Sequence, residues 1–221
     1  YNRICWAYFV VLLFLFLPSS LDRTHRQVLD GAVGGIIVFI LFYTKITFGI
    51  VAVFFLFFLI VLFSRESRSP AIAMAVFLLG VVIVEFSLGI NSAYLHDVLF
   101  TIRASDGGYV ESIMRPLRFL PSLIQSIVIV LAAVGLYLFY KPRVKDLLFI
   151  TFVFVVSVYI AAQNTGDQSL PSVVVILALV IERVRSAHAN SSGVLREPRI
   201  LAALAFLVIF VSGPIFFRSV A

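Results

Sequence analysis

Charged residues and cysteine are both scarce in this sequence. Asp, Glu, Lys and Arg make up 13% of the 221 residues, against about 25% in an ordinary soluble domain. Hydrophobic residues reach 62%, and the mean hydropathy is +1.13. Together these values exclude a soluble globular protein. The single cysteine, Cys5, excludes an internal disulfide and a cysteine-based zinc or redox motif.

Long apolar runs, separated by charged residues, proline or glycine, occupy most of the chain. They lack the alternation of barrel strands, and lipid offers no hydrogen-bond partner to the backbone, so helices are the structure that crosses the membrane. We therefore predict an all-α fold, a polytopic transmembrane bundle of about eight helices, some short and paired, forming a single domain over residues 1–221. The runs are residues 5–17, 29–43, 46–63, 71–90, 120–140, 147–162, 170–181 and 200–217.

The first residue is Tyr1, and no basic segment or small-residue cleavage site precedes the first apolar run. We therefore expect a fragment of a longer chain that lacks its natural N-terminus.

Two of the helices are expected to break at polar turns. One helix over residues 29–63 would be roughly 50 Å long, whereas the hydrocarbon core is about 30 Å thick, so we expect a turn at Thr44 and Lys45. The same reasoning divides residues 147–181 at the polar segment 163–168. Non-helical backbone at that depth is tolerated only in protein or beside water, which predicts a recess where the two turns meet. Gly31 and Gly35 have the spacing that allows helices to approach closely.

The distribution of basic residues predicts the orientation. The net charge is +6, but Lys and Arg lie singly between apolar runs, which excludes a nucleic-acid-binding stripe. Most of them fall in the connections near residues 23–26, 65–68, 141–145 and 182–199, which are therefore cytoplasmic. The outer face then carries residues 1–3, both polar turns and the connection 91–119. Treating 29–63 as one span keeps the loops 64–70, 141–146 and 182–199 cytoplasmic but leaves Lys45 inside the membrane; helix length favours the break.

The connection 91–119 contains apolar residues at helical spacing, and we interpret its first part as an amphipathic helix at the membrane interface. These residues are Tyr94, Leu95, Val98, Leu99 and Ile102.

Lys45 is the sharpest candidate for a functional residue, because a Lys at membrane depth costs on the order of 2.5–3.5 kcal/mol. Either it grips the phosphate of a lipid-linked substrate, or it extends to the headgroups or pairs with Glu85. Arg3 is expected on the same face, where the two cations would clamp a phosphate; the alternative is an interfacial anchor beside Trp6. For Glu85 a structural pairing with Lys45 or Arg3 is favoured over a role as catalytic base.

The second polar turn supplies groups that hydrogen-bond sugar hydroxyls, although any solvated turn has the same chemistry. The candidates there are Gln163, Asn164 and Asp167. Asp97, beside His96, is a weak candidate for a catalytic carboxylate. The three histidines are far apart in sequence, so no metal site is expected, and no cofactor is expected either.

Several short motifs together resemble bacterial membrane proteins of the GT-C glycosyltransferase type. They are Tyr1-Asn2-Arg3, Gly31-Ala32-Val33-Gly34-Gly35 leading to Tyr43-Thr44-Lys45-Ile46-Thr47-Phe48-Gly49, and Gln163-Asn164 followed by Leu170-Pro171. The layout is similar to that of polyprenyl-phosphate-dependent sugar transferases. The resemblance implies a lipid-phosphate sugar donor, an active site on the outer face, and contacts from Lys45 and Arg3 to the donor phosphate.

The resemblance also implies an acidic base in a first outer loop, which would precede Tyr1, so the catalytic base is not named. The expected reaction is attack of an acceptor hydroxyl on the anomeric carbon of the lipid-linked sugar, with cations stabilising the departing phosphate. The expected partners are membrane lipid and this donor, in a bacterial plasma membrane; the oligomeric state stays open. The alternatives are a transporter or flippase of lipid-linked sugar, for which short broken helices are equally natural, and a non-catalytic scaffold.

Overall fold

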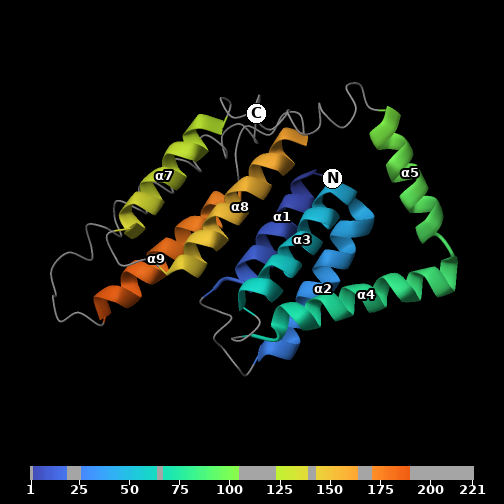
Figure 1. Ribbon diagram of the computed structural model, residues 1–221, viewed down its shortest axis with the longest axis horizontal. Coiled ribbons are helices and arrows are strands. Elements are labelled where there is room, and N and C mark those ends of the chain that lie inside the picture. Colours follow the sequence, from blue (N-terminus) through green and yellow to red (C-terminus); the bar gives the residue numbers. More distant parts are fainter. Residues whose placement is uncertain are drawn as a thin grey trace. The chain divides into compact units, whose positions relative to one another are not determined.

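The apolar runs that fall within the described residues form α-helices (Figure 1). The computed structural model describes residues 2–18, 26–63, 67–104, 123–138, 143–163 and 171–189, and none of these residues forms a strand. The helices are α1 (Asn2–Leu15), α2 (Gln27–Thr44), α3 (Ile46–Phe63), α4 (Ser69–Leu88), α5 (Asn91–Ala104), α7 (Ile124–Leu138), α8 (Val144–Gln163) and α9 (Val173–Ala189). The predicted all-α fold is confirmed. The helix expected over residues 200–217 lies outside the described residues.

Four of the described helices, α2, α3, α4 and α8, are long and apolar enough to cross a membrane. They have 18 to 20 residues, which at about 1.5 Å per residue gives roughly 27–30 Å, the thickness of the hydrocarbon core. The chain is therefore an integral membrane protein. Helix α1 and the part of α7 from Ser126 to Leu138 are apolar but shorter.

Contacts between Cα atoms divide the chain into two units. The first comprises Tyr1–Arg118 together with Ala162–Asn164, and the second comprises Phe119–Ala161 together with Thr165–Ala221. Helices α1 to α5 belong to the first unit, and α7, α9 and most of α8 belong to the second.

In the first unit, helices α1 to α4 run alternately in opposite directions. Ring pairs join Phe9 to Phe48 and Phe16 to Phe55, so α1 and α3 run parallel. Helix α2 runs back between them, and Figure 1 shows α1, α2 and α3 next to one another. The same end of the unit therefore holds the start of α1 and the junction of α2 with α3.

Helix α4 packs against α2 through glycines, as the Gly31 and Gly35 spacing predicts. A Cβ atom at Gly31 would lie 2.7 Å from Cβ of Ile72, and one at Gly35 would lie 2.6 Å from Cβ of Val76. Gly31 faces Ile72, and Gly35, one turn later, faces Val76, so α2 and α4 run parallel. The absence of side chains at these two glycines is what allows the helices to pack this closely.

The ends of two helices differ from the expected bounds. Helix α8 begins at Val144, before the expected start at Leu147, and α9 continues to Ala189, past the expected end at Ile181. An acidic residue in a first helical turn is favoured by the helix dipole, and Asp146 occupies such a turn in α8. Part of the predicted loop 182–199 is therefore helical.

Candidate functional site

Lys45 forms the whole junction between α2 and α3. Its backbone is extended, with φ −154° and ψ 105°. Its N–H donates to the carbonyl of Leu41 at 2.9 Å, and its own carbonyl accepts from the N–H of Gly49 at 3.1 Å. The helix of α2 thus ends at Thr44 and a new helix starts at Ile46, which confirms the predicted break.

The Lys45 side chain is held between α1 and α3. Its ammonium donates a hydrogen bond to Oδ1 of Asn2, and Nζ lies 5.9 Å from the centroid of the Phe48 ring. Phe48 in turn packs edge-to-face on Trp6 at 5.4 Å. Because the Asn2 amide is neutral, this bond orients the ammonium without cancelling its charge, and an aromatic face adds a favourable cation contact.

Arg3 follows Asn2 in the first turn of α1, and its side chain is exposed. Asn2, which binds the ammonium of Lys45, immediately precedes Arg3 in the sequence. The structure therefore brings the two predicted cations to the same end of the first unit.

Glu85 has a different partner from the expected Lys45 or Arg3. Its Oε2 atom accepts a hydrogen bond from the backbone N–H of Asn91 at 2.9 Å. Helix α4 ends with Gly89 in the left-handed region, at φ 61°, and this turn carries the start of α5 back to the carboxylate. The first N–H groups of a helix attract anions, so Glu85 acts as a cap for α5.

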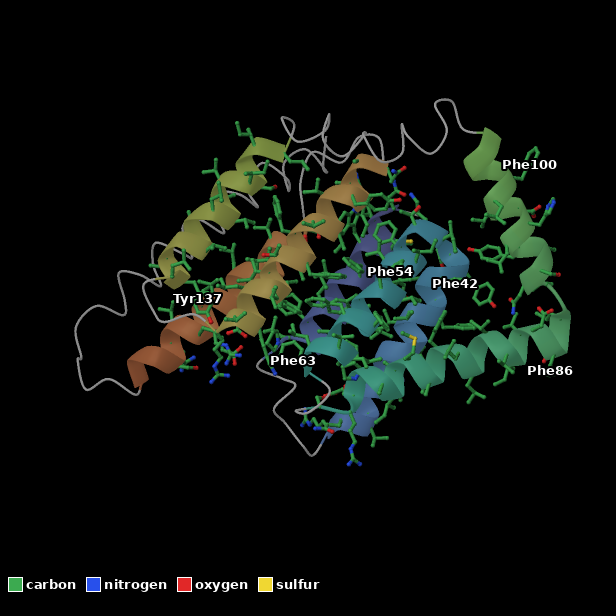
Figure 2. All side chains as sticks on the ribbon, in the orientation of Figure 1. Phe42, Phe54, Phe63, Phe86, Phe100 and Tyr137 are labelled. Carbon is green, nitrogen blue, oxygen red and sulfur yellow. The ribbon has the colours of Figure 1, made fainter. Side chains whose placement is uncertain are left out.

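The start of α5 is bonded to the end of α2 through tyrosines. The hydroxyl of Tyr43 donates to Oδ1 of Asn91 at 2.5 Å, and the hydroxyl of Tyr94 donates to the carbonyl of Phe42 at 2.6 Å. Burial, with a smaller effect from Tyr43, raises the pKa of the Tyr94 hydroxyl above its ordinary 10.0, so this group stays a donor at neutral pH. Figure 2 labels Phe42 on the side of α2 that faces α5.

These tyrosine contacts were not predicted from the sequence. The available signal was the spacing of Asn91 and Tyr94, which places both on neighbouring positions of one helical face. The interpretation of α5 as an amphipathic helix used Tyr94 only as an apolar residue and overlooked its hydroxyl.

The remaining predicted residues are placed only in part. Gln163 is the last residue of α8 and is half-buried, and its position is grouped with the first unit. Asn164 and Asp167 lie outside the described residues. Asp97 is exposed on α5, about one turn after Tyr94. The convergence of the two polar turns stays a prediction.

The second unit contains a buried charged cluster that was also missed. Asp146, whose side chain is 1% exposed, accepts two hydrogen bonds from Arg183, at 2.9 Å from Nε and 3.2 Å from Nη2. The hydroxyl of Tyr137, labelled in Figure 2, donates to the same carboxylate at 2.6 Å, and the N–H of Arg143 donates to that hydroxyl at 3.1 Å. Three helices are thereby tied together.

Comparison with known proteins gives no relative. No protein-family model, no curated protein and no solved structure matches this chain.

The chemistry of the site therefore has to be inferred from its residues. Lys45 and Arg3 place two cations at one end of a set of apolar helices, and Asn2 adds a neutral hydrogen-bonding group. An ammonium is a compact donor for phosphate oxygens, and a guanidinium offers a planar pair of donors. This arrangement is suited to binding an anionic headgroup whose hydrocarbon part lies among the helices.

Proposed function

We propose that this chain is part of a membrane glycosyltransferase that uses a polyprenyl-phosphate-linked sugar. In this proposal Lys45 and Arg3 bind the phosphate of the donor at the outer face of a bacterial plasma membrane. The observation that supports it best is the position of Lys45, which is a cation held at a single-residue break between two apolar helices by Asn2 and Phe48.

The length of the helices supports a lipid-linked ligand rather than a free anion. Helix α3 leads away from Lys45 through 18 residues of which none is charged. A polyprenyl phosphate has its charge at one end of a long hydrocarbon chain, so a cation at the end of such helices matches both parts of it. A water-soluble sugar phosphate would gain nothing from the apolar part.

In the proposed reaction an acceptor hydroxyl attacks the anomeric carbon, and the bond from that carbon to the phosphate oxygen breaks. Lys45 and Arg3 stabilise the negative charge that develops on the departing phosphate. This electrostatic stabilisation is strongest where water is excluded. Asp97 is the first carboxylate to test as the base, because it lies on α5, whose start is bonded to the end of α2.

The experiment is sugar transfer from a labelled polyprenyl-phosphate donor by membranes that contain the full-length protein. Loss of a charge-assisted hydrogen bond worth about 1.5–3 kcal/mol predicts that Lys45→Ala lowers transfer roughly 10- to 150-fold. Lys145→Ala, in the second unit, is the matched control and should keep normal transfer. Equal amounts of each variant in the membrane fraction show that insertion is unaffected.

Two results would contradict the proposal. Transfer by Lys45→Ala at the rate of the control would remove Lys45 from the donor site. Movement of the labelled lipid-linked sugar across the membrane, with no transfer to any acceptor, would instead favour a transporter.

A further inference from the structure

Tyr94 supplies a hydrogen-bond partner that α2 cannot provide for itself. The last carbonyl groups of a helix have no partner further along the same helix. Leu41 has its carbonyl satisfied by the N–H of Lys45 at 2.9 Å, and the next carbonyl, that of Phe42, accepts from the Tyr94 hydroxyl at 2.6 Å. Helix α5 therefore caps the end of α2, three residues before Lys45.

Phe42 is also pressed against the start of α3. A Cβ atom built at Gly49 would lie 2.4 Å from Cα of Phe42, so the two backbones are in direct contact. Phe42 and Gly49 flank Lys45 in sequence. A movement of Phe42 therefore displaces the chain on both sides of Lys45.

The first turn of α5, which carries Tyr94, is itself fixed by hydrogen bonds. Asn91 accepts from Tyr43 at 2.5 Å, donates through its side chain to the carbonyl of Val81 at 3.0 Å, and has its N–H bonded to Glu85. The N–H of Tyr94 adds a bond to the carbonyl of Ile90 at 2.9 Å. The hydroxyl of Tyr94 is thus presented to α2 from a first helical turn that is anchored to α4.

We propose that Tyr94 is a positioning residue for Lys45, because its bond to Phe42 keeps the α2–α3 junction in the conformation that presents the ammonium to a lipid phosphate. The inference rests on the proposed function for the identity of the ligand. In this proposal Tyr94 does not contact the ligand itself and acts only through Lys45. Without the bond, the final turn of α2 loses a partner, Lys45 samples more conformations and the donor binds more weakly.

The test uses Tyr94→Phe, which removes the hydroxyl and keeps the ring that packs on Phe42 at 5.7 Å between centroids. Tyr159→Phe, at an exposed tyrosine of α8, is the matched control. The first readout is the rate at which a maleimide labels a cysteine introduced by Thr44→Cys, beside Lys45. The native cysteine, Cys5, is fully buried, and labelling of protein without the Thr44→Cys change measures the background. The second is the split between KM for the donor and kcat.

In Tyr94→Phe we expect labelling at position 44 to be at least about threefold faster, and KM for the donor to rise about three- to tenfold with kcat unchanged, as loss of one hydrogen bond predicts. Tyr159→Phe should change neither. Adding Tyr94→Phe to Lys45→Ala should cause no further loss of transfer, since both changes act on one contact.

Unchanged labelling in Tyr94→Phe overturns the inference, and so does faster labelling with an unchanged KM. If the wild-type protein transfers no sugar, the proposed function fails. In that case faster labelling in Tyr94→Phe still supports the coupling of Tyr94 to the Lys45 junction.

Discussion

The guanidinium of Arg183 in α9 meets the carboxylate of Asp146 in the first turn of α8, and two of its nitrogen atoms donate hydrogen bonds to this one buried side chain. The position halfway between the two residues in sequence falls at Asn164 and Thr165, inside the polar segment that was expected to turn the chain. The reversal of the chain at that segment stays a prediction, and the ion pair itself joins the first turn of α8 to α9.

Replacing Asp146 by Ala should strongly destabilise the second unit. The change leaves Arg183 without its buried counter-charge and Tyr137 without its acceptor, and the removal of one partner of a buried pair costs about 3–5 kcal/mol. Tyr137→Phe should cost less, about 1.5–3 kcal/mol, because the charge pair is kept while the hydroxyl loses its bond to the carboxylate and the bond that it accepts from the N–H of Arg143. The measurement is the free energy of unfolding in mixed micelles titrated with sodium dodecyl sulfate.

A double variant separates the cost of an unpaired charge from the value of the pair. Asp146→Leu combined with Arg183→Met removes both charges and should recover most of the stability that Asp146→Ala loses, because replacing a whole buried pair by apolar groups is often neutral. A double variant as unstable as Asp146→Ala would contradict this account.

Substitution of Gly35 tests the contact between α2 and α4. In Gly35→Ala the new methyl group would lie 2.6 Å from the carbonyl oxygen of Ala73 and from Cβ of Val76, and forcing an extra methyl into such an interface costs about 1–3 kcal/mol. The same titration with sodium dodecyl sulfate measures the loss.

The matched control for Gly35 is Gly135 in α7, where nothing lies within 4 Å of an added Cβ atom. Gly135→Ala should therefore raise stability or leave it unchanged, since Ala favours a helix over Gly by about 0.8–1.0 kcal/mol. Equal losses in the two variants would show that the close approach at Gly35 is not what limits the packing.

Much of the first unit was predictable because its signals are local. Apolar length set the break at Lys45, and glycine spacing indicated the approach of α2 to α4. Depth and charge singled out Lys45 itself. Each of these depends on residues that are close in the sequence.

The contacts missed by the sequence analysis join residues far apart in the chain. Tyr94 bonds a carbonyl of α2 from 52 positions away, and Arg183 meets Asp146 from 37 positions away. A backbone carbonyl left over at a helix end has no side-chain signature, so no pattern predicts which hydroxyl will reach it. The pairing of Glu85 was misassigned for the same reason, because its partner is a backbone N–H that the turn at Gly89 brings near.

The orientation of α2 gives the last prediction. Thr44 lies at one end of this helix and Arg26 at the other; the N–H of Arg68 donates to Gln27 at 3.3 Å, which places Arg68 at the Arg26 end. The excess of basic residues in the loops predicts that this end is cytoplasmic. A membrane-impermeant maleimide should therefore label Thr44→Cys from outside intact bacterial cells, and should label Arg26→Cys and Arg68→Cys only in inverted vesicles. Each of these two substitutions removes a basic residue, and basic residues set the orientation of the chain in the membrane. Testing the two positions in separate variants controls for this effect. Labelling of positions 26 and 44 from the same side would mean that α2 does not cross the membrane, and a donor site at Lys45 on the outer face would then be untenable.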